Sequence, residues 1–126
     1  MIAADTSTWI AFFAGERGED VQILDKALAD RQVLMVPAVL AELLSDSQIP
    51  VSTAESLQEL PLMQIESGYW QRAGELRTKV LAMGRRARLG DALIAQSCLD
   101  HRIALLTRDR DFRGFAEIVD LTLVAE

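Results

Sequence analysis

Four acidic residues are spaced through the chain where metal-assisted chemistry would need them. Each follows an apolar stretch typical of a strand or lies in the first turns of a helix. They are Asp5, Glu42, Asp91 and Asp109. In parallel α/β sheets ligands bind at the carboxyl ends of the strands, so these four carboxylates would meet at one edge. They would repel by roughly 4 kcal/mol per close pair at an effective dielectric of about 20, and a divalent cation removes that repulsion. The pattern therefore predicts a magnesium-dependent hydrolytic site.

Two of the acids also have a purely structural interpretation. Asp5 could cap the following helix, but Thr6 or Ser7 could do the same, which would leave Asp5 free to face a metal. Glu42 lies in a helix expected to be largely buried, where a carboxylate is costly unless it is paired or bound to a metal. The alternative for Glu42 is an exposed helix face.

The residues beside the other two acids support a role in the site to different degrees. Asp91 follows Gly90 and could be a plain helix cap. Asp109 is the stronger candidate, because Thr107 and Arg108 crowd the same strand end and the Thr107 hydroxyl can donate to a carboxylate or a phosphate. Asp111 and Asp46 are possible auxiliary acids, for which a solvated turn is the simpler expectation.

The elements that must position these acids alternate along the chain as in a parallel sheet with crossover helices. Strands are expected near residues 1–4, 33–36, 61–65, 103–106 and 121–124. A helix follows the first strand, and an amphipathic helix with Val21, Leu24 and Leu28 on one face comes next. Pro37 begins the helix of Glu42, and polar residues 45–56 predict a loop and a short helix. A longer helix over about 69–83 is expected to bury Trp70, Ala73, Leu76 and Val80. The helix from Asp91 to about Asp100 is apolar almost all round, as a central helix would be.

The charge distribution bears on the substrate. The net charge of −6 argues against a nucleic-acid ligand at first, because phosphates favour basic surfaces. Yet basic residues gather beside two of the acids: Arg72, Arg77, Lys79, Arg85, Arg86 and Arg88 before Asp91, and Arg108, Arg110 and Arg113 around Asp109. Each one alone fits a solvated helix face. Together they indicate a surface that can hold phosphates.

Composition excludes several other classes. The 126 residues fit one domain, 1–126, large enough to bury about two-thirds of its unfolded surface. One histidine, His101, disfavours a zinc site or a histidine pair. One cysteine, Cys98, excludes an internal disulfide, reads as a core thiol and fits a reducing cytoplasm. We expect no signal peptide and no membrane span. The sequence has no phosphate-binding glycine loop, which disfavours an ATPase or a GTPase.

Four blocks of the sequence, in this order and spacing, resemble the PIN domain, and most closely the VapC-like toxins of bacterial toxin–antitoxin pairs. The blocks are Ile2-Ala3-Ala4-Asp5-Thr6-Ser7, Leu40-Ala41-Glu42-Leu43, Gly90-Asp91-Ala92-Leu93-Ile94-Ala95 and Leu106-Thr107-Arg108-Asp109-Arg110-Asp111-Phe112. They run from residue 2 to about 112. One departure is Pro37-Ala38, which replaces the Ser or Thr often found before the helix of the Glu.

The resemblance implies a three-layer α/β/α, Rossmann-like PIN fold with a five-stranded parallel sheet. It implies a Mg²⁺- or Mn²⁺-dependent endoribonuclease, a homodimer and a cognate VapB-like antitoxin. Carried over by residue, the metal-binding acids are Asp5, Glu42, Asp91 and Asp109, and the supporting hydroxyls are Thr6, Ser7 and Thr107. Arg85, Arg86, Arg88 and Arg108 are candidates for phosphate contacts with RNA. The alternatives are a housekeeping PIN nuclease of RNA processing and a catalytically silent binding module.

Apolar residues on the first two helices suggest where a partner would bind. Ile10, Phe12 and Phe13, with Val21, Leu24 and Leu28, offer more apolar surface than two short helices usually bury against a sheet. We expect part of this surface to form a groove for an amphipathic antitoxin helix. The alternative is that these residues fill the core or a homodimer interface.

Overall fold

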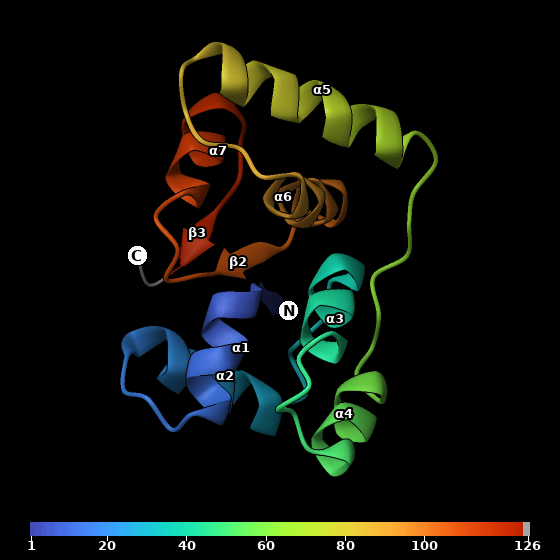
Figure 1. The fold of residues 1–126 in the computed structure, drawn as a ribbon, viewed down its shortest axis with the longest axis vertical. Helices are drawn as coiled ribbons and strands as arrows, with labels where there is room; N and C mark the ends of the chain where they lie inside the picture. The colour runs from blue at the N-terminus through green and yellow to red at the C-terminus, as the bar shows by residue number, and fades with distance from the viewer. Residues whose placement is uncertain (125–126) are drawn as a thin grey trace.

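The computed structural model describes residues 1–124, and within them strands and helices alternate along the chain. The elements are β1 (Ile2–Ala4), α1 (Thr6–Phe13), α2 (Glu19–Ala29), α3 (Pro37–Leu44), α4 (Val51–Gln58), α5 (Tyr69–Ala82), α6 (Leu89–His101), β2 (Ala104–Leu106), α7 (Phe112–Ile118) and β3 (Leu123–Val124). Helices α5, α6 and α7 lie on one side of the strands and α1 and α2 on the other (Figure 1). The molecule is therefore an α/β fold, as the alternation of elements predicts.

The strands form a parallel sheet in the order β1-β2-β3. Ala3 lies opposite Leu105, and Leu106 lies opposite Val124. The expected strands at 33–36 and 61–65 each add only one parallel bridge, Ile2 with Val33 and Met35 with Leu62. The five-stranded sheet is thus not confirmed. Pro37 begins α3 immediately after Val36, so the extended segment ends there.

Helix α6 is the central helix that its composition predicts. Ala92, Ile94, Ala95 and Cys98 are all at most 1% exposed, and they belong to the main hydrophobic core. Burial raises the pKa of the Cys98 thiol to about 12, so this cysteine is a protonated core residue, as expected. The helix begins at Leu89, two residues before the predicted start.

One expectation about the helices is wrong, and one helix was not expected. Trp70 is 64% exposed, and Tyr69 takes the buried position at the start of α5. The Tyr69 hydroxyl donates to the Leu93 carbonyl at 2.7 Å, which satisfies the buried phenol. Ala73, Leu76 and Val80 are buried on the same face, as expected. The helix after Asp111 is not among the elements expected from the sequence: α7 buries Phe112 and Phe115 completely. Gly114 within this short segment weakens its local helical signal.

Along the part of the chain that the structure describes, no helix combines the length and apolar composition needed to cross a bilayer.

Candidate metal centre

Three carboxylates meet where α6 begins and β2 ends. One oxygen each of Asp91, Asp109 and Asp111 lies within 4.8 Å of the other two. Asp91 is in the first turn of α6, and the other two lie on the loop between β2 and α7. Clustered carboxylate oxygens are the donor set that Mg²⁺ and Mn²⁺ prefer. An acidic cluster alone is no proof of a metal, so the state of each carboxylate decides what the cluster can do.

Asp91 is the carboxylate whose surroundings most need a cation. Its Oδ2 is buried, and no hydrogen-bond partner is found for it among residues 1–124. Burial first, and then the charge of Asp109, raise the pKa of Asp91 to about 6. A buried oxygen without a partner is expensive, and a bound cation would supply the missing interaction. The residues at this position therefore fit a divalent metal.

Asp5 lies next to the cluster and is only 3% exposed. Its Oδ1 accepts hydrogen bonds from the Thr8 backbone N–H at 3.1 Å and from the Ser7 hydroxyl at 2.7 Å, so Asp5 itself caps α1. The expectation that Thr6 or Ser7 would take over the cap is wrong. Burial raises the pKa of Asp5, and the charge of Asp109 adds to the effect, while hydrogen bonds from Thr107, Ser7 and Thr8 oppose it. The capping role thus holds this carboxylate in one orientation beside Asp109.

Thr107 connects Asp5 to the loop that carries two of the clustered acids. Its hydroxyl donates to Asp5 Oδ2 at 2.7 Å and accepts from the Asp109 backbone N–H at 3.0 Å. The Asp111 backbone N–H in turn donates to Asp109 Oδ1 at 2.9 Å, the geometry of an Asx turn. One chain of hydrogen bonds therefore orients the carboxylates of Asp5 and Asp109.

Glu42 lies at the edge of the acidic cluster rather than within it. The residue is exposed, contrary to the expectation of a buried carboxylate. The reason is that α3 turns Val39 and Leu43 into the core, which leaves Glu42 on the outer face. The Thr6 hydroxyl donates to Glu42 Oε1 at 2.7 Å, and Oε2 lies 3.5 Å from the point where a Cβ would stand at Gly90. Glu42 thus reaches the N-terminus of α6 without joining the three clustered acids.

Each of the three hydroxyls singled out in the sequence donates to one of the four predicted acids. Ser7 and Thr107 serve Asp5, and Thr6 serves Glu42. The structure also adds Asp111 to the cluster, a residue for which a solvated turn was the simpler expectation. The signal available in the sequence was the Asp109-x-Asp111 spacing after a strand, where the backbone N–H of the second acid can bond the side chain of the first.

The four candidate RNA-binding arginines have different surroundings. Arg85 pairs with Glu117 at 2.8 Å, and Arg86 lies 3.9 Å from Asp111. Arg88 is exposed, and its charge acts against the burial that raises the pKa of Asp91. Arg108 turns away from the cluster and donates to both carboxylate oxygens of Asp20. Arg86 and Arg88 are therefore the two candidate arginines that lie beside the cluster and could contact a phosphate.

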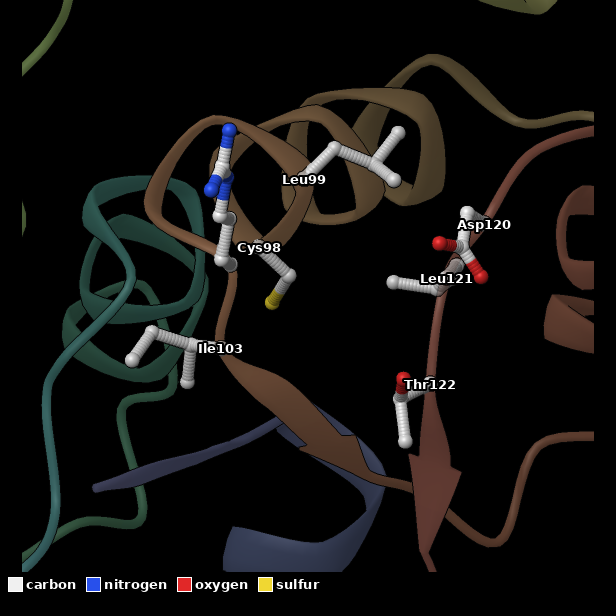
Figure 2. A pocket seen from close by; sticks show the side chains of 7 residues that line it. Cys98, Leu99, Ile103, Asp120, Leu121 and Thr122 are labelled. Atoms are coloured by element: carbon white, nitrogen blue, oxygen red, sulfur yellow. The ribbon is translucent and has the colours of Figure 1, made fainter.

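A separate hollow lies at the other end of the strands. It has a volume of about 450 Å³ and lies between the C-terminal end of α6 and the start of β3, with Cys98, Ile103 and Leu121 among its walls (Figure 2). No predicted site residue lines it. In parallel sheets ligands bind at the carboxyl ends of the strands, which is the end that the acids occupy.

Comparison with known proteins adds an independent line of evidence. The family model described as PIN domain matches residues 2–118. Among solved structures, the chain is similar to VapBC-5, a member of the VapBC family of toxin–antitoxin systems from Mycobacterium tuberculosis, at 22% identity and TM-score 0.69, over 99% of this chain and 98% of that one. It is similar to VapBC-1 from nontypeable Haemophilus influenzae at 19% identity and TM-score 0.72, over 98% and 97%.

A third similar structure is VapBC2 from Rickettsia felis bound to a fragment of promoter DNA, at 22% identity and TM-score 0.69, over 98% of both chains. At these identities the likeness establishes the fold. No curated protein matches the chain by sequence.

Proposed function

The chain belongs to the PIN domain family, and we propose that it is a Mg²⁺- or Mn²⁺-dependent endoribonuclease acting as the toxin of a toxin–antitoxin pair. One observation supports this activity above the others. The buried Oδ2 of Asp91 has no hydrogen-bond partner among the described residues and lies in the group formed with Asp109 and Asp111. A catalytically silent module gains nothing from keeping such an oxygen unpaired, since an unpaired buried polar atom lowers stability.

Each residue of the site has a role in this proposal. Asp91, Asp109 and Asp111 would hold the metal, Asp5 would face it from the cap of α1, and Glu42 would complete the acidic rim. When bound, the metal neutralises charge on the scissile phosphate and activates water. Ser7 and Thr107 keep the Asp5 carboxylate in place through its two oxygens, and Thr6 restrains Glu42.

Arginines beside the site account for RNA binding by an acidic protein. Arg86 and Arg88 precede α6 on an exposed segment next to Asp91 and Asp111, where they would contact phosphates that flank the cleaved bond. Arg85 could join them by exchanging Glu117 for a phosphate, because both members of that pair are largely exposed. We also propose that the protein acts in the cytoplasm and forms the homodimer that the resemblance implies. Sedimentation velocity measures the dimer.

RNA cleavage by the purified protein tests the activity. With Mg²⁺ or Mn²⁺ the wild type should cleave a labelled RNA, and EDTA should stop it. Asp91→Asn and Asp111→Asn should each lower the rate by roughly a hundredfold or more, because each removes a charge that holds the metal. Asp46→Asn is the matched control, because Asp46 is exposed on the loop between α3 and α4. This variant should cleave RNA at the wild-type rate.

Cleavage that survives both EDTA and Asp91→Asn would contradict the assignment. A wild-type protein that binds Mn²⁺ yet leaves RNA intact would favour the silent module. If it cleaves RNA but no small partner is encoded alongside, the housekeeping nuclease is favoured.

The antitoxin surface differs from the one expected between α1 and α2. Leu24 is fully buried and cannot line a groove. Ile10 and Phe13, 47% and 39% exposed, line instead a hollow of about 340 Å³ against Ile49 and Pro50 on the segment between α3 and α4. We propose that an apolar side of the antitoxin segment occupies this hollow, as in helix-in-groove recognition. The solved relatives named above are described as toxin–antitoxin systems, which supports a partner of this kind.

Charge placed in this hollow tests the partner site. Ile10→Glu should weaken antitoxin binding by at least about tenfold, because burying an unpaired carboxylate in the interface is costly. Leu81→Glu is the control: Leu81 is 46% exposed on α5, away from this hollow. Equal binding by the two variants, measured by calorimetry with the co-encoded partner, would refute the location.

A further inference from the structure

We propose that Arg108 and Asp20 form a clamp that holds the loop of residues 107–111 in its metal-binding geometry. The proposal rests on the proposed function for its consequence, but its evidence is the contacts of these two residues. Arg108 lies between Thr107 and Asp109, whose polar groups serve the site, while its own side chain leaves the site in the direction of α2. Arg108 is thus a positioning residue rather than a ligand.

The clamp is a two-point ion pair across 88 residues of sequence. Arg108 Nε donates to Asp20 Oδ2 at 2.9 Å, and Nη2 donates to Asp20 Oδ1 at 2.8 Å. The planar guanidinium meets the carboxylate with both oxygens, a geometry that fixes orientation as well as distance. Weaker contacts reach Glu16 Oε2 at 3.4 Å and the Arg17 carbonyl at 3.3 Å.

Asp20 is buried and is held in place by two residues besides its own helix, Arg108 and Thr8. The residue is 4% exposed, and its Oδ2 also accepts from the Thr8 hydroxyl at 2.9 Å. The Arg108 guanidinium holds the pKa of Asp20 below its usual value. Since Thr8 also donates its backbone N–H to Asp5, Asp20 and Asp5 share an anchor on α1.

The backbone of Arg108 is tied to the site from the opposite direction. Its N–H donates to the Ser7 hydroxyl at 3.4 Å, and that hydroxyl donates to Asp5. A change at the guanidinium would therefore shift a loop whose two neighbouring residues orient Asp5 and supply Asp109. Partners that orient metal-binding groups from outside the first layer typically change metal affinity by 10- to 100-fold when lost.

Gly18 lies so close to the ion pair that a larger residue would collide with it. Its φ is +156°, and a Cβ built there would lie 2.5 Å from Asp20 Oδ1 and 2.8 Å from Arg108 Nη2. Gly18→Ala would therefore push the pair apart without removing either charge, and it would also strain the backbone at this positive φ. It gives a second way to disturb the ion pair.

A second ion pair in the molecule supplies the control. Arg72 donates to both oxygens of Asp100, with Nε to Oδ1 at 3.1 Å and Nη2 to Oδ2 at 2.6 Å. Its side chains are 40% and 9% exposed, against 33% and 6% for Arg108 and Asp20. Asp100 lies nine residues after Asp91 on α6, roughly 13 Å along the helix. A purely structural role predicts the same consequences for both pairs.

The experiment compares Arg108→Lys, Gly18→Ala and Arg72→Lys with the wild type. Mn²⁺ affinity is measured by electron paramagnetic resonance well below each melting temperature, and RNA cleavage is measured separately. Lysine keeps the charge but loses the two-point contact. We expect Mn²⁺ to bind about tenfold more weakly to Arg108→Lys and Gly18→Ala, and unchanged to Arg72→Lys even where its melting temperature falls equally.

The outcomes separate the clamp from the proposed function. Wild-type Mn²⁺ affinity in both Arg108→Lys and Gly18→Ala overturns the clamp, as does an equal loss in Arg72→Lys. A wild type that binds Mn²⁺ without cleaving RNA refutes the nuclease, while a selective loss in the first two variants still supports the clamp. A wild type that binds no Mn²⁺ overturns both.

Discussion

At the scale of single residues, the ionised form of Asp91 that would bind a metal is the form that destabilises the metal-free fold. Its pKa of about 6 means that the folded protein resists ionising this carboxyl, because it is partly buried and faces Asp109. In the unfolded chain the same group would ionise near pH 3.9. The contribution of Asp91 to stability is therefore fully present below about pH 4 and is lost as the pH rises through about 6.

This shift predicts a pH dependence that Asp91→Asn should remove. Without metal, the wild type should lose roughly 1 kcal/mol more unfolding free energy than Asp91→Asn between pH 4.5 and 7, a value reduced for the solvent that reaches the half-buried group. Asparagine keeps the shape but cannot ionise. Urea denaturation in EDTA at the two pH values measures the difference. Parallel pH profiles for the two proteins would show that Asp91 does not titrate in this range.

At the scale of elements, the sequence pattern predicted the strands and helices that depend on local apolar runs. The apolar runs marked β1, β2 and the buried helix α6. Asp5, Asp91 and Asp109 fall at the strand or helix ends expected of them, whereas Glu42 lies toward the C-terminal end of α3. Ala73, Leu76 and Val80 of α5 are buried as their spacing predicts, but Tyr69 takes the place expected for Trp70, because its hydroxyl finds a partner on α6, in a distant part of the sequence. The clamp between Arg108 and Asp20 was missed for the same reason: it joins segments 88 residues apart.

The two corrected helices carry a paired prediction. Phe115→Ala should cost about 3–5 kcal/mol, because Phe115 is fully buried on α7 and its removal leaves a cavity. Trp70→Ala should cost less than about 1 kcal/mol, because Trp70 is 64% exposed. Urea denaturation of the two variants measures both values. A loss for Trp70→Ala as large as that for Phe115→Ala would mean that the Trp70 side chain is buried after all.

At the scale of the whole molecule, the candidate site links metal binding to folding. The three carboxylates come from the start of α6 and the loop before α7, so only the folded chain brings them together. A ligand that binds only the folded state stabilises it by RT ln(1 + c/Kd), where c is the ligand concentration, a gain that grows with the logarithm of that concentration. The repulsion that the acids impose on the metal-free fold and the stability gained from the metal are thus two consequences of one arrangement.

The last prediction measures that linkage. At pH 7.5, Mn²⁺ at a hundred times its Kd should add about 2.7 kcal/mol of stability and raise the melting temperature by roughly 10 °C. At pH 5 the gain should shrink, because Asp91, with its pKa of about 6, is then mostly protonated and the metal must displace the proton. Asp91→Asn should lose most of the gain at both pH values, and Asp46→Asn should keep it. NaCl at matched ionic strength controls for screening. A melting temperature indifferent to Mn²⁺ at both pH values would exclude a metal shared by Asp91, Asp109 and Asp111.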